Sequence, residues 1–255
     1  MANPWTMKME QFTSFTPDQR QQLDALIDER VESYAPRRDI LKEGQRVDEC
    51  HLVLSGIAAR YKILPDGSRQ IFAFLIPGDL CDAEVFVLEE MDHSVMALSE
   101  TRCAIIPATR MKALLREVSC LAEALWWGTM TDLAVLRERI VDHGRRDARE
   151  RIAHLFYEML VRYRLVGGAA DGSFPFPVTQ EELADATGLT PVHVNRTLQQ
   201  LREDGLIALR SKTLTVLDPA ELKRVAGFSA NYLHLQRTED GTASRDVASR
   251  VSDLV

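Results

Sequence analysis

The chain has 255 residues, of which 45% are hydrophobic and 27% charged, and its formal net charge is −7 at pH 7. This composition is typical of a globular protein, and the length allows two compact domains. No apolar run reaches the roughly 18 residues that a membrane helix needs, and the N-terminus lacks the pattern of a signal peptide. We therefore expect a cytoplasmic protein with no membrane partner.

The cysteines are spaced too irregularly to predict a metal site. None of them forms a C-x-x-C pair, and in a reducing compartment such cysteines are more often buried thiols than disulfides. We therefore expect no bound metal. The cysteines are Cys50, Cys81, Cys103 and Cys120.

The first half of the chain changes from a helical to a strand pattern. Residues 12–34 carry apolar anchors at helical spacing and are expected to form a helix, which Pro36 ends. From residue 39 onward, short runs rich in Val, Ile and Phe are separated by glycines at roughly 11-residue intervals. Residues 95–107 continue this pattern, and the Asp-Gly step at residues 66–67 predicts a hairpin turn. Together they predict a β-sandwich or jelly roll.

The helical period returns in residues 111–146. Apolar side chains recur there near a 3.5-residue spacing with charged residues between them, which favours a seam for a second copy of the helix. The alternative is an amphipathic helix packed on its own domain. Gly144 is expected to break the helix as a hinge, and a further helix is expected from residue 147. The predicted dimer seam consists of Trp126, Leu133, Leu136 and Ile140.

Two short helices joined by a turn are predicted late in the chain. Thr179 and Glu182 form the pattern of a capping box at the start of the first helix. Gly188 turns the chain, and Thr190 followed by Pro191 begins the second helix. A capped helix, a glycine turn and a second capped helix predict a helix-turn-helix.

The first turns of the second helix hold Arg196 and no acidic residue. Val194, Leu198 and Leu201 are expected to face inward, and the nearby acids lie on the first helix instead. The acidic excess is concentrated earlier, because residues 1–110 hold 18 of the 38 acids but only 12 of the 31 Lys and Arg. A locally cationic reading face can therefore exist in an acidic protein. The outward residues are Pro191, Val192, Asn195, Arg196 and Gln199.

A two-stranded hairpin is predicted after the second helix. It turns at Ser211 and Lys212, and Arg210 and Lys212 lie at its tip, where a wing can rest on DNA phosphates. Residues 167–177, before the first helix, are rich in Gly, Ala and Pro and are expected to form a loop. The alternative interpretation of residues 178–216 is a structural helical hairpin that binds no nucleic acid.

These features together resemble the Crp/Fnr family of bacterial transcription regulators. The resemblance covers roughly residues 15–225 and rests on "LKEG", "LVLSGIAARYKILPDGSRQI", "IPGDL", the long central helix and "VTQEELADATGLTPVHVNRTLQQLREDGLI". It implies an α+β protein with an N-terminal, jelly-roll-like β-roll sensor domain over residues 1–118. A dimerisation helix would follow over 119–144, and a winged helix-turn-helix over 145–225. Outside the resemblance, residues 226–255 are expected to form a C-terminal extension, partly disordered beyond Leu235 because that segment has no aromatic residue and little periodicity.

The resemblance also implies how such a protein binds DNA. It would act as a homodimer on two-fold symmetric double-stranded DNA, controlled by a signal at the β-roll, with RNA polymerase as a further partner. Matched by position, Val192, Asn195 and Arg196 would read bases, with Arg196 donating to guanine. A glutamate stands in place of Val192 in much of the family, so only apolar contact is left at this position. The other expected DNA contacts are Thr179, Gln180, Thr190, Pro191, His193, Gln199, Arg210 and Lys212.

The effector pocket departs from the family pattern. Cyclic-nucleotide binders carry a Gly-Glu pair after "GD" and an Arg-Ser pair further along, where this chain has Asp82-Ala83 and His93-Ser94. The fixed cation is lost, and two acids would repel a phosphate, so cyclic AMP is not expected. The candidate pocket consists of Asp82, Ala83, Glu84, His93 and Ser94.

The sequence does not identify a cofactor. No cysteine precedes Cys50, so the N-terminal cysteine cluster of the family's oxygen sensors is missing and an iron–sulfur cluster is not expected. His51 and His93 leave haem open. No G-x-S-x-G, Walker A, H-E-x-x-H or G-x-G-x-x-G motif is present, so we expect no enzyme. The alternative function is a ligand-binding interaction module that does not read DNA.

Overall fold

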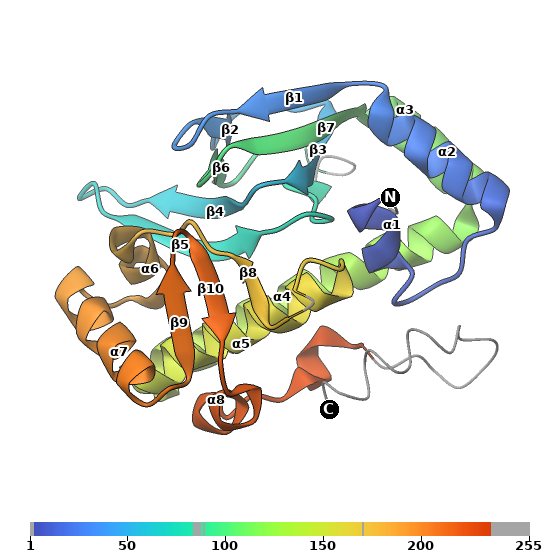
Figure 1. The fold of residues 1–255 in the computed structure, drawn as a ribbon. Coiled ribbons are helices and arrows are strands. Elements are labelled where there is room, and N and C mark those ends of the chain that lie inside the picture. Colours follow the sequence, from blue (N-terminus) through green and yellow to red (C-terminus); the bar gives the residue numbers. More distant parts are fainter. Residues whose placement is uncertain (1–2, 84–87, 89, 170, 236–255) are drawn as a thin grey trace.

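The chain forms two units joined by long helices, as Figure 1 shows. This computed structural model describes residues 3–83, 88, 90–169 and 171–235. Two sheets form the N-terminal unit, and a small three-stranded sheet with several short helices forms the C-terminal unit. In this part of the chain, no helix combines the length and the apolar character needed to cross a bilayer.

Two short helices precede the sheets. Both α1 (Pro4–Met9) and α2 (Pro17–Asp28) begin at a proline, which needs no N–H partner at this position. The helix predicted over residues 12–34 is wrong at both ends. The observed helix α2 begins only at Pro17, and Val31–Tyr34 forms strand β1, which pairs with β7. Pairing with a distant strand outweighs the local apolar spacing here.

The N-terminal unit is the predicted jelly-roll-like roll of two antiparallel sheets, and the α+β fold class is confirmed. One sheet has the order β1-β7-β3 and the other the order β2-β6-β4-β5. Gly56 makes the turn between β3 and β4 possible, since its φ is +86° and a Cβ there would lie 2.3 Å from the Glu100 carbonyl oxygen. The strands are β2 (Asp39–Leu41), β3 (Glu49–Ser55), β4 (Ala58–Ile63), β5 (Arg69–Leu75), β6 (Ser94–Ala97) and β7 (Thr101–Pro107).

The helical region after the roll is divided at Val118. Before it lies α3 (Ala108–Glu117), and after it the 27-residue helix α4 (Ser119–Arg145). Gly144 lies inside α4, so the prediction that it breaks the helix is wrong. The chain leaves the helix at Arg146, whose ψ is 140°. A glycine inside a helix costs only about 1 kcal/mol relative to alanine, which tertiary contacts can offset.

The C-terminal unit is built around α5 (Ala148–Leu165), most of whose residues are buried. β8 (Ser173–Pro175) lies in the region predicted as a loop and adds a third strand to the wing sheet, in the order β8-β10-β9. The loop prediction was therefore wrong for these residues. The remaining elements are α6 (Gln180–Thr187), α7 (Pro191–Glu203), β9 (Ile207–Arg210), β10 (Thr213–Val216), α8 (Pro219–Ala226) and the 3₁₀ helix η2 (Ala230–Leu233).

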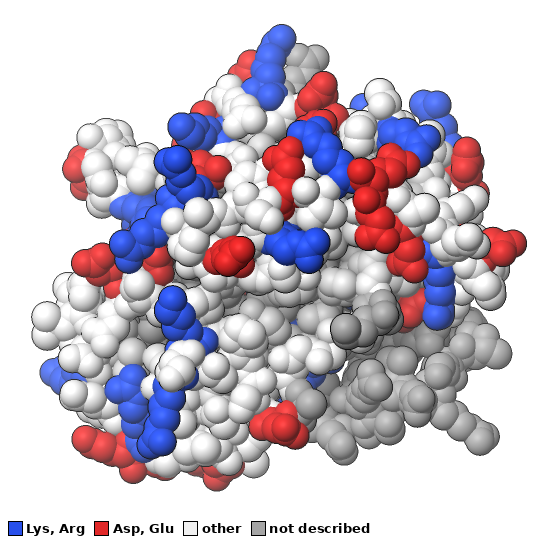
Figure 2. Space-filling model, turned by 45° about the horizontal axis from the view of Figure 1, so that its top comes forward, with Lys and Arg blue, Asp and Glu red and all other residues white. Residues whose placement is uncertain are grey.

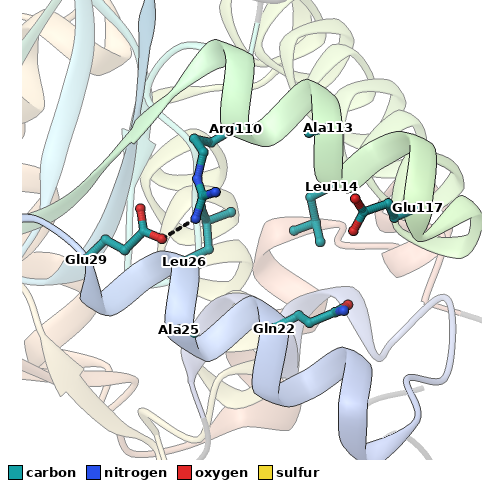
Figure 3. Close-up of a pocket in the computed structure, with 8 residues that line it drawn as sticks. All are labelled: Gln22, Ala25, Leu26, Glu29, Arg110, Ala113, Leu114 and Glu117. Carbon is teal, nitrogen blue, oxygen red and sulfur yellow. Dashed lines mark hydrogen bonds and ion pairs between the residues drawn. The ribbon is translucent and has the colours of Figure 1, made fainter.

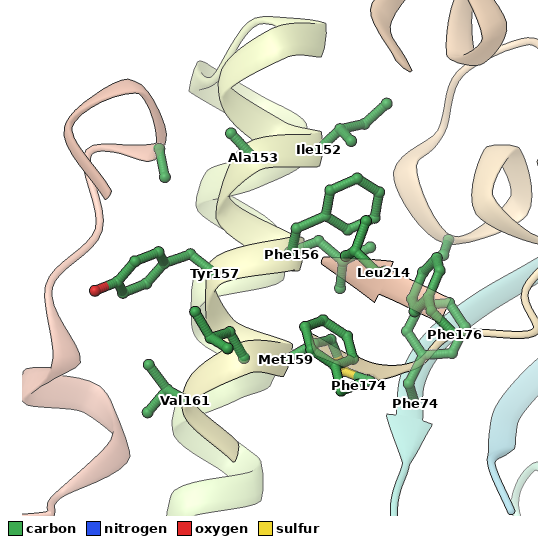
Figure 4. Close-up of a cluster of buried hydrophobic side chains, with 14 of the residues drawn as sticks. Phe74, Ile152, Ala153, Phe156, Tyr157, Met159, Val161, Phe174, Phe176 and Leu214 are labelled. Carbon is green, nitrogen blue, oxygen red and sulfur yellow. The ribbon is translucent and has the colours of Figure 1, made fainter. Parts of the chain in front are cut away.

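One hydrophobic core runs through both units. Phe74 of β5 lies edge-on to Phe176, with ring centroids 6.2 Å apart, and Phe176 lies 5.2 Å from Phe156 of α5. Figure 4 shows these rings between α5, β5 and the segment that follows β8. Fully burying one such ring stabilises the fold by roughly 1.5–3 kcal/mol. The C-terminal unit is therefore packed against the roll rather than loosely tethered to it.

A buried ion-pair network holds the junction of α4 and α5. Arg139 pairs with Asp142 at 2.9 Å and with Glu158 at 2.6 Å, and Arg146 pairs with Asp142 at 2.7 Å. The hydroxyl of Tyr232, from η2, donates to Glu158 at 2.9 Å. Asp142 and Glu158 are buried, and removing a partner from a buried ion pair is strongly destabilising. The network ties η2 to both helices. The predicted disordered tail beyond Leu235 lies outside the described residues.

Candidate nucleic-acid interface

The first helix of the predicted helix-turn-helix is held by local hydrogen bonds. The hydroxyl of Thr179 accepts from the Glu182 N–H at 3.2 Å, and the Glu182 carboxylate accepts from the Thr179 N–H at 2.8 Å. The predicted capping box is therefore confirmed. Gly188 ends α6 with a φ of +64°, a backbone conformation that strongly favours glycine.

The second helix, α7, also begins as predicted. The hydroxyl of Thr190 accepts from the His193 N–H at 3.2 Å, and Pro191 occupies the first helical position. Val194, Leu198 and Leu201 are buried, so the predicted inward face is confirmed. Three apolar contacts fix the rotation of α7 about its axis, and its opposite face is turned to solvent.

The outward face of α7 carries the residues expected to read bases. Val192 is 81% exposed, and Asn195, Arg196 and Gln199 are also exposed. Asn195 accepts a hydrogen bond from the Gln180 amide of α6 at 3.4 Å, which joins the two helices at this face. Of the remaining expected DNA contacts here, Gln180, Thr190 and Pro191 are exposed, and Thr179 and His193 are half-buried.

The wing forms at the predicted place. β9 and β10 pair antiparallel around Ser211 and Lys212, whose φ angles of +49° and +62° belong to a tight hairpin turn. Arg210 and Lys212 are exposed at the tip. The Lys212 carbonyl accepts from the Phe176 N–H at 2.7 Å, which anchors the turn to the segment after β8.

Two of the three acidic residues of α6 are engaged by other groups of the protein. Glu182 is buried within the capping box, and Asp185 pairs with Arg69 of β5 at 2.7 Å, while the backbone carbonyl of Asp185 accepts from Gln70 at 2.7 Å. Sequence reasoning missed the pair with Arg69, because 116 residues separate the two and no local pattern marks it. Figure 2 shows acidic and basic side chains interleaved across one face of the molecule. The net charge of −7 therefore does not form a single acidic field on that face.

The predicted dimer seam lies along α4 on a largely exposed face. Trp126 is 67% exposed, Leu133 44% and Ile140 73%, whereas Leu136 is half-buried. Met130 lies between Trp126 and Leu133 and is also exposed, although sequence reasoning did not include it. These large apolar residues form an exposed stripe along α4. The surfaces of monomeric soluble proteins rarely carry such a stripe.

The residues predicted for the effector pocket are largely bound to other protein groups. Both carboxylate oxygens of Asp82 are engaged by His51, which approaches with its backbone N–H and with Nδ1 at 2.8 Å each. His93 lies 2.5 Å from the Asp92 carboxylate, and this hydrogen bond lowers the pKa of Asp92. Ser94 accepts from the Glu43 N–H at 3.0 Å, and Ala83 is half-buried. Glu84 lies outside the described residues.

A cation that sequence reasoning missed does reach this loop. Arg60 of β4 is 8% exposed and donates to the carbonyl oxygens of Leu80 at 2.8 Å and Cys81 at 3.2 Å. It also pairs with Asp132 of α4 at 3.2 Å. Arg60 therefore connects the loop that precedes Asp82 with the long helix.

The two histidines that left haem open each lie against a carboxylate. His51 faces Asp82 through Nδ1, and His93 faces Asp92. Within the described ranges, no three His, Cys, Asp or Glu side chains are grouped to hold a metal ion. A pocket of about 240 Å³ lies between α2 and α3, where Arg110 forms an ion pair with Glu29 (Figure 3). This pocket is separate from every residue predicted to bind an effector or DNA.

Comparisons with known proteins match both units. The family described as "Crp-like helix-turn-helix domain" matches residues 150–225, and the "Cyclic nucleotide-binding domain" family matches residues 31–118. The nitrogen fixation regulation protein FixK of Rhizobium meliloti is 32% identical over 196 residues, which cover 76% of this chain and 85% of that protein. The transcriptional activator protein FnrL of Cereibacter sphaeroides is 29% identical over 199 residues, covering 76% and 79%.

A solved structure agrees with these sequence relatives. FixK2 from Bradyrhizobium japonicum superposes with a TM-score of 0.70 at 25% identity, covering 79% of this chain and 98% of that one. The capped helix-turn-helix, the wing, the β-roll and the long helix between them are thus found together in one architecture. The chain belongs to the Crp/Fnr family of DNA-binding transcription regulators.

Proposed function

We propose that the protein recognises a specific two-fold symmetric DNA sequence as a homodimer and that each protomer inserts α7 into the major groove. The observation that carries this proposal is the exposed face of the first turns of α7, residues 191–199, which holds Arg196 and no acidic residue. Arg196 would donate to guanine O6 and N7, Val192 would contact a thymine methyl, and Asn195 would meet a base edge. Phosphates would be bound by Thr179, Gln180, Thr190, His193, Arg210 and Lys212, and Pro191 and Gln199 would lie against the DNA beside them.

The dimer would form along α4. Trp126, Met130, Leu133 and Ile140 would be covered by the same residues of a second copy in an isologous contact. Such pairing would place the two α7 helices on successive turns of DNA, with half-sites about 34 Å apart. The two-fold axis of such a dimer would require an operator with the same symmetry.

Control would come from a change at the β-roll that favours one dimer arrangement over another. Such a change is a shift between two conformations and requires no catalytic step. RNA polymerase is the partner through which a DNA-bound activator would act. A regulator that binds DNA and RNA polymerase would act in the cytoplasm, where both are found.

The first experiment is selection of binding sites from a random DNA duplex library with the purified full chain, followed by fluorescence anisotropy. We expect a two-fold symmetric consensus and an affinity that falls steeply with salt. Arg196→Ala is expected to reduce the preference for the consensus over random DNA on the order of 5- to 150-fold. Arg202→Ala is the matched control, because it removes the same charge from the last turn of the same helix.

Three outcomes would contradict the proposal. The first is that selection yields no symmetric consensus. The second is that Arg196→Ala and Arg202→Ala lose the same amount of specificity, because α7 would then contribute only a general positive charge. The third is that Arg196→Ala changes nothing, which would favour an interaction module that does not read DNA.

A further inference from the structure

The DNA-binding unit touches the β-roll of its own protomer at two separate places along β5. One is the apolar contact of Phe74 with Phe176. The other lies at the start of the strand, where Arg69 donates through Nε to the Asp185 carboxylate at 2.8 Å and pairs with it through Nη2 at 2.7 Å. Because β5 is extended, the two places lie roughly 16 Å apart, at about 3.3 Å per residue. Two contacts this far apart resist a pivot of the unit about either one.

The contact at the start of β5 also holds the last turn of α6. The Gln70 amide donates to the backbone carbonyl of Asp185 at 2.7 Å, and Arg151 of α5 donates to that of Thr187 at 2.5 Å. Carbonyls at a helix C-terminus lack partners within the helix, and α6 has no basic residue in its own last turn. The roll therefore supplies a donor and a cation that α6 lacks.

This contact joins the reading helix to the dimer helix through the roll. α6 contacts both β5 and α7, and Figure 1 shows it beside the hairpin of β4 and β5. The roll is in turn attached to α4 by the ion pair of Arg60 with Asp132 at 3.2 Å. Val192 remains 81% exposed on α7, so the docked arrangement leaves the reading face free for DNA.

A dimer distinguishes half-site spacings only if each α7 is fixed relative to the dimer helices. One extra base pair moves a half-site by about 3.4 Å and turns it by roughly 35° around the DNA axis. A DNA-binding unit that can pivot on the roll would follow such a step. A unit held at both places along β5 would not.

We propose that Arg69 and Asp185 determine how strictly the protein demands one spacing between the two half-sites. Their ion pair would hold α6, and through it α7, at one position on the roll. Operators whose half-sites are shifted by one base pair would then be bound poorly. Neither residue would touch a base, so both are positioning residues that act through α7. This inference rests on the proposed function, because it requires a dimer that reads two half-sites.

The test is fluorescence anisotropy of the purified full chain on its selected operator and on the same operator with one base pair added or removed between the half-sites. The unaltered chain should prefer the selected spacing. Asp185→Arg places two guanidinium groups against each other and should lower this preference about five-fold, which corresponds to roughly 1 kcal/mol. The preference is a ratio measured with one protein, so a general gain in affinity from the added positive charge cancels.

Arg69→Asp disrupts the same pair from the roll and leaves the sequence of the DNA-binding unit unaltered. It should lower the preference by a similar factor. The double variant Arg69→Asp with Asp185→Arg restores opposite charges and should recover most of the preference.

Asp204→Arg is the matched control. It makes the same charge change as Asp185→Arg, but Asp204 pairs with Arg149 at 2.6 Å, and both residues belong to the DNA-binding unit. The spacing preference should therefore be unchanged. Thermal unfolding checks the fold of each variant, and sedimentation velocity should show the oligomeric state of the unaltered chain, because the exposed face of α4 is untouched.

Four results would overturn the proposal. The unaltered chain binds all spacings equally, the single variants keep its preference, the double variant recovers nothing, or Asp204→Arg loses as much as Asp185→Arg. A failure of the proposed function looks different, because site selection would then yield no symmetric consensus at all.

Discussion

Arg60 of β4 and Asp132 of α4 form an ion pair at 3.2 Å across the boundary between the β-roll and the long helix. The same guanidinium donates to the backbone carbonyls of Leu80 and Cys81. One buried side chain thus contacts the loop of the sensor domain and the helix proposed to form the dimer. A displacement of that loop would change the position of the guanidinium and with it the contact to α4.

Arg60→Met is expected to lower the free energy of unfolding by about 1–3 kcal/mol, because buried carbonyl oxygens would lose their donor. Asp132→Asn should cost less than about 1 kcal/mol, since this carboxylate is 36% exposed and solvent screens the pair. Urea unfolding followed by circular dichroism measures both. Equal losses would show that the ion pair, and not the bonds to the loop, is the important contact of Arg60.

Val192→Glu tests how α7 reads DNA. Val192 is 81% exposed, so the substitution should not disturb packing. A glutamate here can accept from cytosine N4, and we expect a new preference for cytosine worth roughly 1–3 kcal/mol at one position of each half-site. Val192→Gln is the uncharged control and should favour adenine instead. Site selection with both variants is the measurement, and an unchanged consensus would place this position away from the bases.

Leu133→Glu tests the proposed dimer. A charge buried opposite its own copy is strongly unfavourable, so we expect a shift from dimer to monomer in sedimentation velocity. Leu64→Glu is the control, because Leu64 is 48% exposed, close to the 44% of Leu133, but lies in the turn between β4 and β5. A dimer that survives Leu133→Glu, or one that Leu64→Glu dissociates equally, would contradict the role of α4.

His154 predicts a specific pH dependence of stability. The side chain is fully buried, and burial lowers the pKa of His154 below its ordinary 6.5 although Asp142 and Glu158 act in the opposite direction. The opposing charges facing the ring are Glu138 and Asp142 of α4 and Glu158 of α5, while Arg139 and Arg146 lower its pKa further.

The unfolded chain therefore binds a proton on His154 at a higher pH than the folded chain does. Stability should fall as the pH drops below 6.5, with a slope of at most about 1.4 kcal/mol per pH unit from this group. In His154→Gln, this part of the slope between pH 7.5 and 5.5 should disappear. The exposed His143→Gln should keep it, and urea titrations at several pH values compare the three proteins. Parallel curves for all three would show that His154 does not titrate differently on folding.

Local signals in the sequence were sufficient for the helix-turn-helix. Capping at Thr179 and Thr190, the glycine turn at Gly188 and the inward Val194 and Leu198 involve residues close in the chain. Their hydrogen bonds and periodicity can therefore be read without knowledge of the fold. The same signals failed for β1 and β8, because a strand is stabilised by a partner that lies elsewhere in the sequence.

The sequence by itself determined the family, the helix-turn-helix with its wing and the residues that the first turns of α7 expose. Only the tertiary structure decided that Arg69 neutralises Asp185, that Arg60 joins the sensor loop to α4 and that His51 occupies Asp82. These contacts join residues far apart in the chain. Their geometry depends on how sheets and helices pack, and no local pattern encodes that.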